Sequence, residues 1–88
     1  MRTVTVSGDR IYQARLAANM SRSDLAYEIR RLSKGRHRTE PSLIGRWETG
    51  QNTPSANLLP LIAKATGKSM DFFYTEEATS AEEEDESG

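Results

Sequence analysis

Two short helices separated by a basic loop constrain the fold of this 88-residue chain more than any other feature. The first begins with Ser21 and Asp24 in the spacing of a capping box, in which each side chain accepts a hydrogen bond from the other residue's backbone N–H. Leu25, Ile29 and Leu32 then recur on one helical face. This pattern predicts an amphipathic helix that ends close to Leu32.

The second helix is expected to start at Thr39 or Glu40, with Pro41 in its first turn. A proline there costs no hydrogen bond, because the first N–H groups of a helix have no intrahelical acceptor. Ile44 and Trp47 follow three residues apart and therefore share one face. We expect that face to be buried, with Trp47 as a core residue.

Three further helices complete the prediction. The pattern turns helical at Asp9, resumes after the breaker cluster at residues 50–54, and ends in a short turn from Met70 to Tyr74. The chain has no cysteine, so helix packing alone must hold the fold together. The expected fold class is a compact all-α domain of five helices.

Charge divides the chain into a basic part and an acidic part. Residues 1–74 contain all 12 Lys and Arg and six acids, a net charge of +6, whereas residues 75–88 carry −7. We expect residues 1–8 to be an N-terminal arm, because the Val4/Val6 alternation is too brief for a strand of its own, and residues 9–74 to be the folded domain. Residues 75–88 lack large apolar side chains, which predicts an acidic disordered tail.

The composition also argues against several function classes. No apolar run approaches the roughly 20 residues of a membrane span, and no secretory signal pattern is present, so a cytoplasmic location is expected. His37 is the only histidine and has no cysteine or acidic neighbour that would indicate a metal site or a nucleophilic triad. We therefore expect no metal, no cofactor and no enzymatic activity.

The segments Met20–Ala26 and Ile44–Gly50, with Pro54 after them, resemble the two helices of a lambda-repressor-like, Cro-type (XRE) helix-turn-helix domain. The resemblance covers about residues 9–74. It implies a DNA-binding transcriptional regulator, a repressor of the phage or prophage kind, whose second helix lies in the major groove. It also implies an ion pair between Arg15 and Glu48.

In this family the base-reading positions correspond to Pro41, Ser42, Gly45 and Arg46. Pro41 stands where the family commonly has glutamine, and its ring can contact only apolar surface such as a thymine methyl group. Direct readout would then depend on Ser42 and Arg46, while Gly45 would permit close approach. The recognition code of other members therefore does not transfer to this chain.

The stretch between Ala26 and Trp47 is longer than the family pattern, which implies a basic insertion around residues 30–38. We expect it to extend the first helix and to form a loop that grips phosphates, although an ordinary solvated loop is the alternative. Matching positions imply further phosphate contacts. The expected phosphate-contacting residues are Arg22, Arg30, Arg36, His37, Arg38, Asn52 and Thr53.

The expected partner is an operator in double-stranded DNA, bound by a homodimer because one helix reads few base pairs. The C-terminal helical region would supply the dimer contact through Phe72 or Phe73, unless both residues simply cap the core. The rival hypothesis is an antitoxin or other protein-interaction module, whose helix-turn-helix domain autoregulates its operon while the acidic tail binds a protein partner. The tail has no large apolar anchor for such a partner.

Overall fold

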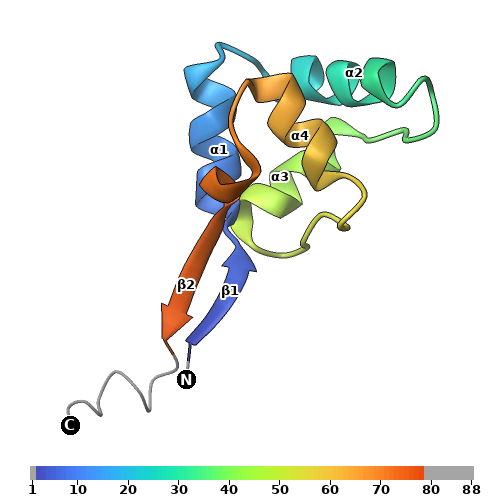
Figure 1. Cartoon of the computed structure of the whole chain (residues 1–88). Helices are drawn as coiled ribbons and strands as arrows, with labels where there is room; N and C mark the ends of the chain where they lie inside the picture. The colour runs from blue at the N-terminus through green and yellow to red at the C-terminus, as the bar shows by residue number, and fades with distance from the viewer. Residues whose placement is uncertain (1, 79–88) are drawn as a thin grey trace, which may run out of the picture.

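The computed structural model describes residues 2–78, which form four α-helices, one 3₁₀ helix and a two-stranded sheet. The elements are β1 (Arg2–Val6), α1 (Gly8–Ala17), α2 (Arg22–Leu32), α3 (Pro41–Thr49), α4 (Leu59–Thr66), η1 (Met70–Phe73) and β2 (Tyr74–Ala78). The helices pack together, and a ribbon of β1 and β2 extends from them (Figure 1). The domain is therefore compact and mostly helical, but the predictions of five helices and of an all-α class are wrong.

The ribbon is formed by parts of the two terminal segments for which the sequence predicted no regular structure, the arm (residues 1–8) and the tail (residues 75–88). β1 and β2 run antiparallel, with Arg2 opposite Ala78 and Val6 opposite Tyr74. The expected N-terminal arm is thus a strand over Arg2–Val6, and residues 75–78 of the expected tail belong to its partner. Each strand is too short to be recognised alone, and the backbone hydrogen bonds that stabilise it come from a segment about 70 residues away in sequence. The remainder of the expected tail, residues 79–88, lies outside the described residues.

The predicted ends of α2 and the predicted place of Pro41 in the first turn of α3 are confirmed, although α3 starts at Pro41 itself, just after the expected Thr39 or Glu40. Ser21 and Asp24 form the capping box: the Ser21 hydroxyl accepts from the Asp24 N–H at 3.0 Å, and the Asp24 carboxylate accepts from the Ser21 N–H at 2.9 Å. α2 ends at Leu32, and Pro41 is the first residue of α3. The local pattern was sufficient here because caps and proline act within one turn.

A close contact between backbones joins the start of α1 to the end of α3. A Cβ atom added at Gly8 would lie 2.2 Å from the Trp47 carbonyl oxygen and 2.8 Å from that of Glu48. Real side chains do not approach backbone oxygens so closely, so only glycine fits without a shift of one helix. This contact fixes the C-terminal half of α3 against α1.

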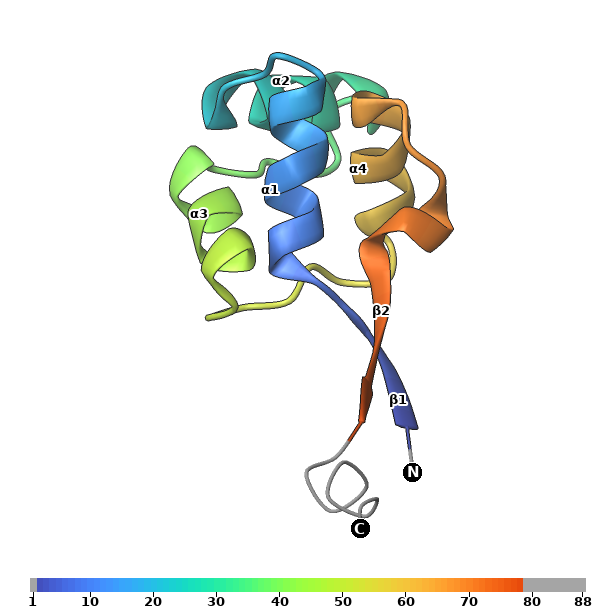
Figure 2. The same ribbon diagram turned by 90° about the vertical axis from the view of Figure 1, so that its left-hand side faces the viewer.

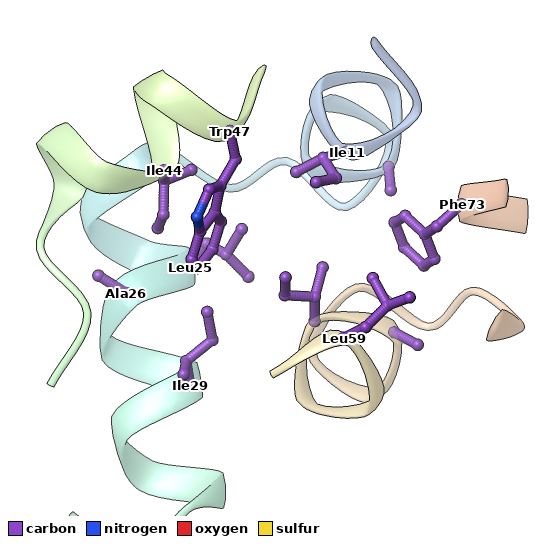
Figure 3. Close-up of a cluster of buried hydrophobic side chains, with 11 residues drawn as sticks. Ile11, Leu25, Ala26, Ile29, Ile44, Trp47, Leu59 and Phe73 are labelled. Atoms are coloured by element: carbon purple, nitrogen blue, oxygen red, sulfur yellow. The ribbon is translucent and has the colours of Figure 1, made fainter. Parts of the chain in front are cut away.

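The core lies between the four α-helices and η1, and Figure 3 shows its side chains converging from all of these elements. Trp47 is 2% exposed, which confirms it as a core residue, and Ile44 beside it is fully buried. Phe73 is also fully buried in its own chain, so it cannot supply the expected dimer contact. Phe72 keeps part of its surface, beneath the Arg10 guanidinium at 4.9 Å and the Lys68 ammonium at 5.1 Å from the ring centroid.

The helix arrangement leaves one side of α3 uncovered. α1 lies between α3 and α4 in Figure 2, so α3 and α4 occupy opposite sides of the domain. α3 packs against α1 and α2, which cover its inner face. No helix within residues 2–78 has the length and apolar character that crossing a bilayer requires.

Candidate nucleic-acid interface

The uncovered face of α3 carries short and hydrogen-bonding side chains. Ser42, Arg46 and Thr49 are exposed and follow one another at i, i+4 and i+7, so they share one face. Ile44 and Trp47 project from the opposite side into the core. A helix anchored on one side and polar on the other is what entry into a DNA groove requires.

The other two expected base-reading positions are less accessible. Pro41 and Gly45 are half-buried. Pro41 borders a hollow next to α2, whereas Gly45 lies beneath the side chain of Arg22, whose Nη1 and Cζ atoms would be 3.1 and 3.2 Å from a Cβ atom at this position. The absent side chain of Gly45 therefore makes room for an arginine from α2.

Glu48 links both arginines that face it. Its Oε2 atom accepts from the Arg15 Nε at 2.6 Å, and its Oε1 atom lies 3.1 Å from Nη2 of both Arg15 and Arg22. The predicted pair between Arg15 and Glu48 is thus confirmed, with side chains only 9% and 3% exposed. The hydrogen bond to Glu48 raises the pKa of Arg15 above its usual value, against the opposing effect of burial. Arg22, at 47% exposed, is the part of this group that solvent reaches.

A hollow of about 330 Å³ opens between α2 and the start of α3. Arg30 and Arg38 both border it, and within residues 5–75 neither forms an ion pair with a carboxylate. Tyr27 also borders it and is 64% exposed, the largest exposed fraction among the large apolar side chains of residues 5–75. Tyr27 was not among the residues predicted from the sequence, although its place three residues before Arg30, on the outer face of a helix, was an available signal. The hollow is lined by Ser23, Ala26, Tyr27, Arg30, Arg38, Thr39, Glu40 and Pro41.

The structure divides the basic insertion into two parts. Lys34 and Gly35 adopt left-handed backbone conformations that turn the chain, and the Ser33 hydroxyl accepts from the His37 N–H at 3.0 Å. Arg36 and His37 border a second hollow, shared with Asn57, Pro60 and Leu61 around the start of α4 rather than with α3. Arg38 alone of the loop arginines lies beside the start of α3.

Asn52 and Thr53 are exposed in the loop that follows α3. They border a third hollow together with Thr5 and Ser7, at the base of β1. Four polar residues thus border one hollow near the C-terminal end of α3. Asn52 and Thr53 were predicted as phosphate contacts from the sequence, whereas Thr5 and Ser7 were not assigned a role.

No family model, curated protein or solved structure matches this chain. Within residues 2–78, no group of three or more His, Cys, Asp or Glu side chains is placed to hold a metal ion. The resemblance to the helix-turn-helix family therefore remains a prediction from motifs. The geometry around α3 is the observation on which a functional proposal can stand.

Proposed function

We propose that this protein is a sequence-specific double-stranded DNA-binding transcriptional regulator of the helix-turn-helix kind, with α3 as its recognition helix. The observation that carries the proposal is the two-sided character of α3. Ile44 and Trp47 fix the helix in the core, while Ser42 and Arg46 face outward. Such a helix can hold base-contacting side chains at fixed positions in a major groove.

The surroundings of α3 support the same proposal. Arg22, Arg30 and Arg38 lie near α3, together with two acids: Glu48, which pairs with both Arg15 and Arg22, and the exposed Glu40, which borders the same hollow as Arg30 and Arg38. This arrangement favours a polyanion, since phosphate contacts from Lys and Arg supply most of the affinity for DNA. In this proposal the flanking arginines bind phosphates and position the helix, and Arg46 reads a base edge.

We further propose that the protein binds as a homodimer, so that two copies of α3 reach half-sites one helical turn apart. Phe72, with the half-buried surface that it retains beside Arg10 and Lys68, is the remaining candidate contact in the C-terminal region. The regulator would act as a repressor by occupying its operator. Sedimentation of the protein alone and with its duplex measures the stoichiometry, and one copy per operator would contradict the dimer.

The direct test is selection of bound duplexes from a random library at a stated salt concentration. The salt concentration must be given because affinity for DNA depends steeply on it. Enrichment of one motif, ideally with two related halves, supports the proposal. A library that stays random after repeated rounds contradicts it.

The second candidate is a protein-interaction module, and one observation favours it. Tyr12 and Leu16, four residues apart on α1, are 42% and 48% exposed and form an apolar pair on the surface. A library that stays random after selection excludes the regulator but not the interaction module, whereas an enriched motif is compatible with both, because an autoregulating module also binds DNA.

A further inference from the structure

Arg22 is already expected from the family resemblance to contact a phosphate; we propose that Glu48 holds its guanidinium in position for that contact, and that Gly45 makes room for the guanidinium instead of contacting a base. This inference rests on the proposed DNA-binding function and adds to it. It assigns a positioning role to Glu48 and reverses the role expected of Gly45.

The geometry of the guanidinium carries the inference. Arg22 uses Nε and Nη2 toward Glu48, at 3.2 and 3.1 Å from the same Oε1 atom. Its Nη1 atom donates no hydrogen bond within residues 5–75, although it lies directly over Gly45 on the accessible side of the domain. An arginine with one edge bound and the other edge exposed keeps donors available in a fixed direction.

The burial of Glu48 keeps its carboxylate, and therefore the bound Arg22 guanidinium, in one position. Its side chain is 3% exposed and is also bound by Arg15, so the carboxylate cannot swing out to follow a mobile surface arginine. An exposed arginine ordinarily loses side-chain entropy when it binds an anion. Here the fold has already restricted Arg22, so binding a phosphate restricts it further only a little.

This position of the Arg22 guanidinium requires that residue 45 has no side chain. A Cβ atom there would lie 3.1–3.2 Å from Nη1 and Cζ of Arg22, which is tight enough to push the guanidinium aside by a few tenths of an ångström. Because the atoms next to this position are the far end of the flexible Arg22 side chain, alanine would displace Arg22 without disturbing the helix. Alanine is also the better helix former, so Gly45→Ala should leave the free energy of unfolding unchanged or higher.

The test is a double-mutant cycle on one selected duplex at several salt concentrations, using Arg22→Ala, Gly45→Ala and the double variant. Lys64→Ala is the matched control, because Lys64 is an exposed cation on α4, across the domain from α3. We expect Arg22→Ala to bind about tenfold more weakly and to lower the log-log salt slope by about one unit. Gly45→Ala should weaken binding several-fold, and in the Arg22→Ala background it should have no further effect, because its target is gone.

Two readouts separate failure of this inference from failure of the proposed function. Additive losses in the cycle, or a Gly45→Ala variant that binds like the original protein, overturn the role of Gly45 while DNA binding itself stands. An original protein that enriches no duplex overturns the function and this inference together. The Nε–H resonance of Arg22 needs no DNA: we expect it to shift in Gly45→Ala, and an unshifted resonance shows that alanine does not move the guanidinium.

Discussion

Arg15→Met and Arg22→Met each remove one of the two guanidinium groups that bind Glu48, yet we expect very different losses of stability. Arg15 and Glu48 are 9% and 3% exposed, whereas Arg22 is 47% exposed. Removing one partner of a buried ion pair costs about 3–5 kcal/mol, and Arg15→Met belongs near 3 kcal/mol because Arg22 still neutralises part of Glu48. An exposed pair contributes only about 0.2–1 kcal/mol, so Arg22→Met should cost about 0.5 kcal/mol.

Urea unfolding measures this difference. With an m-value of about 1–1.5 kcal/mol/M for a domain this small, Arg15→Met should lower the midpoint by roughly 2–3 M, and Arg22→Met by less than about 0.5 M. The raised pKa of Arg15 means that its contribution is present below the unfolded-state pKa and is lost only as the pH rises through the folded-state pKa, far into the alkaline range. The cost of Arg15→Met should therefore be constant between about pH 6 and 9. Equal losses for the two variants would refute the argument that burial decides the strength of these pairs.

Three further predictions concern other parts of the molecule. Gly8→Ala should destabilise the domain by about 1–3 kcal/mol in the same assay, because its Cβ atom would meet the Trp47 and Glu48 carbonyl oxygens; an unchanged midpoint would show that α1 moves away freely. Arg38→Ala should reduce the salt slope of DNA binding by about one unit while Arg36→Ala leaves it unchanged, since only Arg38 lies beside the start of α3; equal slopes for both variants would contradict that division. Ending the chain after Ala78 keeps β2 and removes five acids, which should raise affinity for random DNA at low salt if the acidic segment competes for the basic face; matching titrations of the long and short chains would exclude that competition.

The sequence predicted those features of the fold that depend on neighbours within one or two helical turns. The capping box at Ser21, the place of Pro41 in the first turn of α3 and the burial of Trp47 follow from local spacing, and each is confirmed. The ribbon could not be predicted in the same way. β1 finds its partner at the other end of the chain, and the pairing is made by backbone atoms that no composition reveals.

The candidate site also combines features that the sequence predicted with features that it did not. Ser42 and Arg46 were expected on the outer face of α3 and are exposed there, because helical periodicity determines which side of a helix a residue occupies. Two other features depend instead on how helices and loops pack in three dimensions: the packing of the Arg22 guanidinium over Gly45, and the position of Arg36 near α4. The family resemblance supplied the pair of Arg15 and Glu48 but gave no indication that Arg22 joins it.

The central claim, that α3 reads DNA sequence, is tested most directly by titrating Arg46→Ala and Lys64→Ala against one selected and one random duplex at the same salt concentration. Both variants lose one positive charge, but Arg46 lies on the outer face of α3 and Lys64 on α4. We expect Arg46→Ala to lose about 1–3 kcal/mol of discrimination between the two duplexes while its affinity for random DNA persists, and Lys64→Ala to keep both. Equal losses of Arg46→Ala on the selected and the random duplex would show that Arg46 binds the backbone, and would contradict the assignment of α3 as the recognition helix.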